Sequence, residues 1–498
     1  MNDNPNDDAA RLHPAAHAAS DPDRVALVMS GSGETRTYRE LNEASTRLAL
    51  VLRDRGMRPG DHLAVLLDNE VVFFEAVWAG LRAGLYVTPI NWHLTADEAG
   101  YIVADSGATA LVTSAHLGDT VHELGDDLAA VTTRLAVGGP LEGFEPYEEV
   151  VPGRELDAVS EECEGSWMFY SSGTTGRPKG IVPPAIGGRL GAPSPFTTLL
   201  TGLFGFTDET VYLSPAPLHH AAPAGWTTMT QRLGGTAVVM ERFDPVEFLA
   251  QIERHRVTHT QVVPTHLVRL LKLPERERTR FDLKRSLRLL VHAAAPCPVE
   301  VKRAALDWLG PIIHEFYSGS EGSGFCYIGP DDWLAHPGSV GRSLLGGVHI
   351  LGDGGEELPA GEAGQVWFET PHRFEYHRDP EKTAAAWNDR GWSTLWRSCR
   401  ASPPVSSSSA CWCERSAAPG VVPAFGTNGI RRFGTQVRRA TQGNRPRAAM
   451  AAATRSTATT WAAVRMPTPN VCARAHTAVN AASMRCRRRS ATTCSSHG

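Results

Sequence analysis

A loop rich in glycine and hydroxyl residues follows a short apolar run at residues 168–181, which read MFYSSGTTGRPKGI. Glycine allows positive φ and close approach to a ligand, while hydroxyls and successive backbone N–H groups can surround an anion. Lys179 adds a positive charge. The spacing differs from the GxxxxGK[ST] loop, because Gly173 and Gly176 are three apart and Lys179 is followed by glycine. We predict a polyphosphate-binding loop of another class.

The elements that must carry this loop alternate between helical and strand patterns up to residue 395. Residues 37–56 and 71–84 have apolar side chains at helical spacing, and each segment ends on glycine. The short β-rich runs are HLAVLL (62–67), LYVTPI (85–90), TALVTS (109–114), SWMFYS (166–171), GTAVVM (235–240), HTQVVP (259–264), LRLLVHA (287–293) and GPIIHEFY (310–317). Such alternation predicts an α/β fold with two helix-covered parallel or mixed sheets.

A second pattern begins at about residue 338. The segments GSVGRS (338–343), VHILGD (348–353) and GQVWFET (364–370) are short and are separated by glycine turns. They predict a small antiparallel, partly barrel-like β subdomain over residues 338–395. We therefore expect residues 1–395 to form one large domain that contains this subdomain.

The last 103 residues, 396–498, differ from the rest in composition. They contain sixteen arginines, no lysine and one acidic residue, Glu414, whereas the preceding chain has 33 basic and 53 acidic residues. They also contain no leucine, and they show neither a helical nor a strand period. A segment without leucine cannot easily bury a core, so the pattern predicts an irregular or disordered basic tail of low complexity.

The chain shows no sign of membrane insertion or export. No stretch reaches the eighteen uncharged apolar residues of a membrane helix, and the first ten residues, MNDNPNDDAA, lack the basic start and apolar run of a signal peptide. We expect a cytoplasmic protein without a transmembrane segment. The sequence leaves the oligomeric state open.

The loop SSGTTGRPKG resembles the phosphate-loop motif of the adenylate-forming superfamily, which includes acyl-CoA synthetases, luciferases and the adenylation domains of peptide synthetases. Other segments resemble further motifs of that superfamily in the expected order. They are TYRELNEASTRLA (37–49), PINWHLTADEAGYIVADSGA (89–108), LSPAPLHHAAP (213–223), HAAAPCP (292–298), EFYSGSEG (315–322), HPGSVGRS (336–343), GQVWFET (364–370) and HRDPEKTAAAWNDRGWSTL (377–395). The similarity covers roughly residues 10–395 and is greatest to bacterial fatty-acid-type acyl-CoA synthetases.

The resemblance implies an enzyme that joins a carboxylic acid to AMP, releases pyrophosphate and then transfers the acyl group to CoA. ATP, Mg²⁺ and CoA are the implied cofactors and co-substrates. The residues implied to bind the β- and γ-phosphates are Ser171, Ser172, Gly173, Thr174, Thr175, Gly176 and Lys179. Those implied to bind adenine and the α-phosphate are Ala294, Ala295, Pro296, Tyr317, Ser318, Gly319 and Ser320.

The remaining implied roles concern the metal, the acid and catalysis. Glu321 would hold Mg²⁺ together with phosphate oxygens. His219, His220, Trp226 and Gly319 would line the acid pocket, and Lys179, Ser320 and His220 would act in catalysis. Three positions depart from the usual motifs: Ser320 replaces threonine, Ser318 replaces glycine, and His219 replaces an aromatic residue.

The resemblance stops at Leu395. After WSTL the superfamily has Gly-Asp, whose carboxylate binds the ribose hydroxyls, and later a C-terminal domain with a catalytic lysine, whereas this chain continues with Trp396-Arg397 and has no further lysine. Trp-Arg is encoded by TGG-CGN, and a shift of one base gives GGC-GNN, which can encode Gly-Asp. We therefore hypothesise that residues 396–498 are an out-of-frame reading of a normal C-terminal domain.

Other functions remain open at this stage. One is acyl-adenylate synthesis for a carrier protein instead of CoA. Another is a non-catalytic ATP or acyl-AMP binder, because the catalytic lysine is missing. A third is nucleic-acid binding through the arginine-rich tail, but the tail has no recognisable RNA- or DNA-binding module, so we expect no specific nucleic-acid partner.

Overall fold

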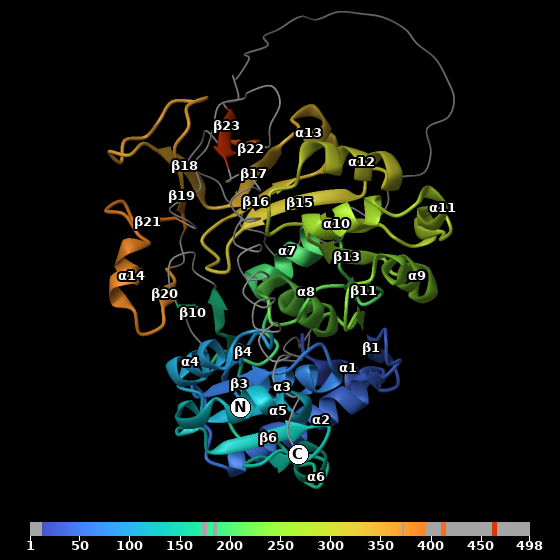
Figure 1. The fold of residues 1–498 in the computed structure, drawn as a ribbon, viewed down its shortest axis with the longest axis vertical. Helices are drawn as coiled ribbons and strands as arrows, with labels where there is room; N and C mark the ends of the chain where they lie inside the picture. The colour runs from blue at the N-terminus through green and yellow to red at the C-terminus, as the bar shows by residue number, and fades with distance from the viewer. Residues whose placement is uncertain are drawn as a thin grey trace, which may run out of the picture.

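Two helix-covered sheets form the body of the protein in a computed structural model (Figure 1). The structure describes residues 12–171, 177–182, 187–370 and 373–394, together with the backbone of two strands at 410–414 and 461–465. Its helices are α1 Pro14–Ser20, α2 Tyr38–Asp54, α3 Val71–Arg82, α4 Ala96–Ser106, α5 Gly118–His122, α6 Tyr147–Val150, α7 Pro195–Leu203, α8 Ala221–Arg232, α9 Pro245–His255, α10 Pro264–Leu271, α11 Glu275–Arg278, α12 Val299–Leu309, α13 Pro330–Ala335 and α14 Pro380–Ala385.

The first sheet, here called the N-terminal sheet, has six parallel strands. In spatial order they are β7 Glu145–Pro146, β6 Thr133–Val137, β5 Ala110–Ser114, β3 His62–Leu66, β4 Tyr86–Pro89 and β8 Ser166–Trp167. The inner strands β3, β4 and β5 are largely apolar, as expected for a parallel sheet that helices cover on both faces. The alternation of strands and helices in the sequence predicted this arrangement.

The second sheet, here called the large sheet, has eleven strands. In spatial order they are β2 Thr35–Thr37, β1 Val25–Met29, β12 Thr236–Val239, β11 Val211–Ser214, β13 His259–Val262, β14 Leu289–His292, β15 Ile313–Ser318, β16 Phe325–Ile328, β17 Ser339–Leu345, β22 Ala410–Glu414 and β23 Trp461–Arg465. The run from β1 to β15 is parallel, and β16 and β17 continue it in antiparallel fashion. The sheet is therefore mixed, as the sequence predicted.

Two small sheets complete the fold. One contains β20 Glu375–Tyr376, β10 Lys179–Val182 and β9 Phe169–Ser171, and the other contains β18 Gly347–Leu351, β19 Gln365–Glu369 and β21 Trp392–Ser393. Both are antiparallel, which confirms a small antiparallel sheet after residue 338. Residues 339–345, which the sequence assigned to the small subdomain, instead pair with β16 in the large sheet.

The basic tail contributes two strands to the described structure. β22 pairs with β17, and β23 pairs with β22. The sequence pattern predicted no regular element in this tail, because the residues show no strand period. The rest of residues 395–498 lies outside the described residues.

The helices begin and end where local side chains satisfy their free backbone groups. Thr37 and Glu40 form a reciprocal capping box at the start of α2, and Thr95 and Glu98 do the same for α4. Helix α4 ends at Gly107, whose φ of 71° suits glycine. These local signals explain why the element boundaries could be predicted from sequence.

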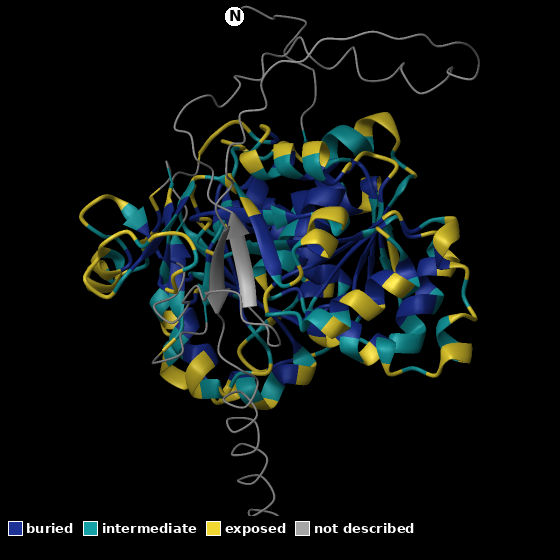
Figure 2. Cartoon of the chain, turned by 90° about the horizontal axis from the view of Figure 1, so that it is seen from above, coloured by how far each residue is buried: buried dark blue, intermediate teal, exposed yellow. Residues whose placement is uncertain are grey.

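Helices α2 and α3 pack between the two main sheets and join them. One buried apolar cluster runs from β1 and β12 of the large sheet through both helices to the N-terminal sheet. Buried polar contacts reinforce it: Trp78 Nε1 donates to Gln231 Oε1 at 2.7 Å, and the Tyr38 hydroxyl contacts the Gln231 carbonyl at 3.0 Å. Figure 2 shows the buried inner strands in dark blue beneath helices with exposed outer faces. Among the described helices, none is long and apolar enough to cross a membrane.

Candidate active site

The glycine-rich loop connects two strands, β9 and β10, that pair with each other. Strands β9 and β10 pair in antiparallel fashion, with Ser171 opposite Lys179 at the end that the loop connects. Residues 172–176, which include five of the predicted phosphate-binding residues, lie outside the described residues. Gly180 is needed for packing, because a Cβ at this position would lie 2.9 Å from Cζ of Tyr170. The hairpin therefore holds Ser171 and Lys179 side by side at the base of the predicted phosphate loop.

Lys179 and Glu321 meet at a third residue, Tyr376. The Lys179 ammonium lies 4.8 Å from the centre of the Tyr376 ring. The Tyr376 hydroxyl donates a hydrogen bond to Glu321 Oε1 at 3.1 Å. Burial raises the pKa of Glu321, while hydrogen bonds from its own backbone and from Tyr376, and the Lys179 charge, oppose the rise. The three side chains come from β10, β20 and the loop after β15.

The ends of β14 and β15 bring two further predicted segments together. These strands are parallel neighbours, with His292 opposite Glu315. Their carboxyl ends lie at the same edge of the sheet, which is the usual ligand-binding edge of an open α/β sheet. Residues 294–296 follow β14, and residues 319–321 follow β15. The sheet register therefore juxtaposes two segments that are more than twenty residues apart in the chain.

The backbone at this edge has an unusual feature. Ala294 has a φ of 72°, a conformation that residues with a side chain rarely adopt. Ala294 and Ala295 are exposed, and Pro296 is half-buried. Strained backbone of this kind persists where the surrounding structure holds it, and it is common at ligand sites. The conformation is consistent with a segment shaped to face a ligand.

The turn after β15 is held by hydrogen bonds and aromatic packing. The Tyr317 ring lies 6.1 Å from that of Phe368, between ring centres. Ser318 Oγ donates to the Gly324 carbonyl at 2.7 Å, and the Gly322 N–H donates to the Gly319 carbonyl at 3.1 Å. Ser320 is exposed, whereas its neighbours Gly319 and Glu321 are half-buried. Ser318, which replaces the usual glycine of the motif, thus connects the turn to the residue that precedes β16.

A buried charged cluster lies beneath the same edge. Lys302 Nζ, from α12, lies 2.5 Å from Glu315 Oε2, and His292 Nε2 lies 3.4 Å from the same oxygen. Lys302 and His292 are 0% exposed and Glu315 is 6% exposed. Burial lowers the pKa of His292, so the imidazole is neutral and the ion pair is formed by Lys302 and Glu315. The pair links α12 to the strand that carries Tyr317.

Two adjacent histidines stand at the start of α8. The rings of His219 and His220 lie 4.4 Å apart, and His220 occupies the N-cap position of α8 without a side-chain capping hydrogen bond. Burial, together with the neighbouring His220 and His93, lowers the pKa of His219 to about 3, so this imidazole is neutral at pH 7. Surrounding protein also lowers the pKa of His220, although part of its surface is exposed.

Trp226 lies six residues after His220 on α8, inside an aromatic cluster. Its ring is stacked on Phe316 at 6.0 Å and lies 5.1 Å from Phe204, between ring centres. Phe316 in turn stacks on Phe325 at 5.1 Å. Trp226 is 2% exposed, so its indole is buried inside this cluster.

Asn69 fixes the loop that leads to the two histidines. This buried side chain follows β3 and accepts a hydrogen bond from the Leu218 N–H at 2.9 Å. Its amide also donates to the carbonyls of Ala216 at 3.2 Å and Met240 at 2.8 Å. The N-terminal sheet therefore positions His219 through its neighbour Leu218.

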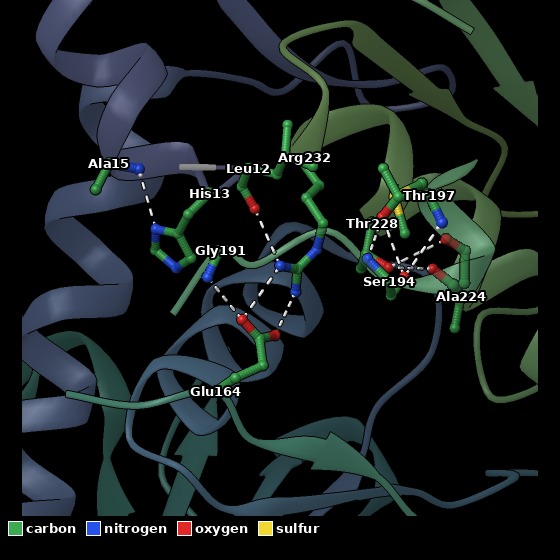
Figure 3. A network of polar contacts seen from close by, with 12 residues as sticks. Leu12, His13, Ala15, Glu164, Gly191, Ser194, Thr197, Ala224, Thr228 and Arg232 are labelled. Atoms are coloured by element: carbon green, nitrogen blue, oxygen red, sulfur yellow. Dashed lines mark hydrogen bonds and ion pairs between the residues drawn. The ribbon is translucent and has the colours of Figure 1, made fainter. Parts of the chain in front are cut away.

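The far end of α8 is tied to the segment after the hairpin (Figure 3). Arg232 Nη2 lies 2.6 Å from Glu164 Oε1, and Glu164 Oε2 also accepts from the Gly191 N–H at 2.8 Å. Arg232 Nη1 donates to the Leu12 carbonyl at 3.0 Å, and the buried His13 caps α1 beside it. Helix α8 is thus anchored to both the hairpin's continuation and the N-terminal segment.

A sequence profile described as AMP-binding enzyme matches residues 15–375. The chain belongs to the AMP-binding enzyme family. It is 31% identical over 378 residues to feruloyl-CoA synthase of Amycolatopsis sp, covering 74% of this chain and 71% of the relative. It is also 28% identical to the fatty acid–[acyl-carrier-protein] ligase ScoC of Streptomyces coeruleorubidus, with 76% and 72% covered.

A solved structure of the same fold is the amide bond synthetase McbA from Marinactinospora thermotolerans. Its TM-score is 0.65 at 26% identity, with 78% of this chain and 76% of that chain covered. The named relatives thus include one ligase that uses CoA, one that uses a carrier protein and one that forms an amide. The superfamily inferred from the motifs is confirmed.

Several positioning residues of this family member were not predicted from its sequence. Tyr376, Asn69 and the Lys302–Glu315 pair all touch or support the predicted site residues. The pair of polar residues Asp68 and Asn69, directly after the apolar run at 62–67, was the available signal for Asn69. Tyr376 lies in a two-residue strand, and Lys302 lies on an otherwise ordinary amphipathic helix, so neither had a local signal.

Proposed function

We propose that the chain descends from, and retains the substrate-binding site of, an ATP-dependent acid–thiol ligase. The carboxylate of the acid attacks the α-phosphorus of ATP, the bond to pyrophosphate breaks, and an acyl-adenylate forms. The CoA thiolate then attacks the acyl carbon and AMP leaves. The convergence of Lys179 and Glu321 on Tyr376, beside the ends of β14 and β15, is the observation that carries this proposal.

The proposed nucleotide side comprises Lys179, residues 294–296, residues 317–321 and Tyr376. Lys179 and the loop 171–176 would hold the β- and γ-phosphates, and Tyr317 with residues 294–296 would enclose adenine. Ser320 would donate to the α-phosphate through its exposed hydroxyl. Hydrogen-bond donors and positive charges stabilise the transition state when they face the phosphoryl oxygens on which negative charge develops.

Glu321 has the chemistry expected for a magnesium site shared with a nucleotide. Mg²⁺ commonly binds through one or two carboxylates together with substrate phosphates. Within the part of the chain that the structure describes, no group of three or more His, Cys, Asp or Glu side chains is arranged to hold a metal by itself. A single carboxylate beside Lys179 therefore fits magnesium delivered with ATP. Mg²⁺ bound there would neutralise phosphate charge.

The proposed acyl side comprises His219, His220 and Trp226. Neutral imidazoles can donate one hydrogen bond to a carboxylate without forming a lasting ion pair, which suits an acid that must still act as a nucleophile. The aromatic cluster around Trp226 offers an apolar wall to the rest of the acid. Fatty, aromatic and sterol-derived acids all remain candidates.

Catalysis by this chain is proposed to be weak. Residues 396–498 contain neither the aspartate that binds ribose nor the catalytic lysine that the superfamily carries in its C-terminal region. Loss of one such stabilising group typically costs about 10²- to 10³-fold in rate. Translation of the neighbouring frame after codon 395 tests the frameshift hypothesis; failure to find a lysine-bearing domain there defeats it.

Two experiments test the proposed function, first for binding of ATP and then for activation of the acid. Calorimetry with MgATP should detect binding, and a pyrophosphate-release assay with fatty and hydroxycinnamic acids should detect activation. Binding without release favours a non-catalytic binder, and absence of both defeats the proposed function. The cytoplasmic location remains a prediction.

The acyl acceptor is the main alternative within this proposal. The similarity to a carrier-protein ligase favours a carrier protein as a second candidate acceptor, and the similarity to feruloyl-CoA synthase favours CoA. Supplying acyl-adenylate with either CoA or a phosphopantetheinylated carrier protein separates the two, because thioester should form with one acceptor and not the other.

A further inference from the structure

Tyr376 lies between the two charged groups that the proposed function assigns to the polyphosphate. Its hydroxyl contacts Glu321, and its ring lies under the ammonium of Lys179. Strand β20 pairs with β10, with Tyr376 opposite Ile181, so the hairpin backbone determines where the tyrosine stands. One side chain therefore contacts a cation and an anion that come from different segments.

The tyrosine is itself held in place. Its backbone N–H donates to Thr383 Oγ1 at 2.9 Å, and its carbonyl accepts from the Asp379 N–H at 3.2 Å, which ties it to the start of α14. The Phe374 ring meets it edge-on at 5.3 Å between ring centres. A group held by backbone pairing and packing can orient its partners at little entropic cost.

The chemistry of a tyrosine suits two charged partners of opposite sign. A lysine and a carboxylate that contacted each other directly would neutralise each other and would have to separate to bind Mg²⁺-phosphate. The face of an aromatic ring attracts an ammonium group, and it leaves the N–H groups on the other side for further acceptors. A phenol hydroxyl donates one hydrogen bond to a carboxylate. The remaining lone pairs of that carboxylate stay available to bind a metal.

We propose that Tyr376 is a positioning residue that keeps Lys179 and Glu321 apart and directs both toward one polyphosphate. This inference rests on the proposed function, because it takes ATP as the ligand of Lys179 and Glu321. It adds to the nucleotide side a residue from β20, which lies between β19 and β21 in the sequence. It also assigns separate tasks to the ring and to the hydroxyl.

The test compares Tyr376→Phe with Tyr376→Leu in the full-length chain. Affinity for ATP is measured by calorimetry with Mg²⁺ and again with EDTA. The phenylalanine variant should bind MgATP about tenfold more weakly, since it loses a hydrogen bond to a charged group. It should bind metal-free ATP as the parent does, because the ring under Lys179 remains. Tyr376→Leu should bind both MgATP and metal-free ATP more weakly than the parent, because it also removes the ring under Lys179.

Tyr170→Phe is the matched control. Tyr170 belongs to the same small sheet, and its hydroxyl bonds Asp105 Oδ2 at 2.6 Å, so the change also removes one tyrosine–carboxylate hydrogen bond. It should leave both affinities unchanged. Thermal unfolding of every variant checks that the sheet is intact.

The outcomes separate this inference from the proposed function. If the parent binds neither form of ATP, the proposed function fails and this inference fails with it. If the parent binds MgATP and Tyr376→Phe binds it equally well, the positioning role is overturned while the proposed function stands. An equal loss for MgATP and metal-free ATP would also overturn it, because the hydroxyl would then support the fold and not Glu321.

Discussion

The proposed nucleotide side and the proposed acyl side differ in the chemistry of their side chains. The nucleotide side has the charged groups Lys179 and Glu321 near its surface and the ion pair Lys302–Glu315 beneath it. The acyl side has neutral imidazoles and a buried aromatic cluster. Phosphate binding needs fixed charge, whereas an acid that must react as a nucleophile is better held by neutral donors.

The comparison also separates charges that stabilise the fold from charges that we propose bind a ligand. Lys302 and Glu315 are buried and contact each other. Glu321 has a neutral hydroxyl as its side-chain partner and keeps partial exposure. Removing a member of the first set should affect stability, and removing a member of the second should affect binding.

The largest expected effect is on stability, from Lys302→Met. This change leaves Glu315 buried without its cation, which typically costs about 3–5 kcal/mol of unfolding free energy. Urea unfolding measures it. The double variant Lys302→Met/Glu315→Gln should recover part of the loss, since no buried charge remains. A loss below about 1 kcal/mol for the single variant would mean that the pair does not stabilise the fold.

The next effect is on binding, from Glu321→Gln. We expect MgATP affinity to fall about 10- to 100-fold, the range for loss of an interaction with a charged group. Stability should stay the same or rise, because burial already disfavours the ionised form of Glu321 and raises its pKa. Calorimetry and urea unfolding on the same sample check both parts. Reduced stability with intact binding would place Glu321 with the charges that serve the fold.

A smaller effect concerns pH and the neutral histidines behind the acyl side. His259 contacts Phe206 in the aromatic cluster, and burial lowers its pKa to about 4. The unfolded chain binds this proton first, so the stability contribution is complete above pH 6.5 and is lost as pH falls toward 4, by up to about 1.4 kcal/mol per unit. His259→Gln should therefore flatten the fall of unfolding free energy between pH 6.5 and 4.5. An unchanged slope would show that His259 does not stay neutral.

The smallest effect is expected for a surface ion pair far from either side of the site. Arg47 and Glu43 lie 3.3 Å apart on α2 and are both solvent-accessible. Arg47→Ala should change the unfolding free energy by no more than about 0.5 kcal/mol and leave ATP affinity unchanged. A larger loss of unfolding free energy would contradict the view that surface ion pairs contribute less to stability than the buried Lys302–Glu315 pair.

Local patterns in the sequence were sufficient for the elements and for the family. Continuous apolar runs between amphipathic helices predicted parallel sheets, and apolar spacing with a terminal Gly56 predicted the segment that forms α2, because these signals act within a few residues. The loop SSGTTGRPKG and the ordered motifs indicated the superfamily for the same reason. The predicted roles of Ser172, Gly173, Thr174, Thr175 and Gly176 remain predictions, because these residues lie outside the described part of the chain.

The tertiary structure alone decided which distant side chains meet. Tyr376 reaches Glu321 because β20 pairs with β10, and Asn69 reaches Leu218 because the N-terminal sheet packs beside α8. Lys302 meets Glu315 because α12 covers β15. Such contacts depend on strand order, register and helix packing, which are set by the burial of the whole apolar surface. No short segment encodes them, so they became visible only once the sheets were assembled.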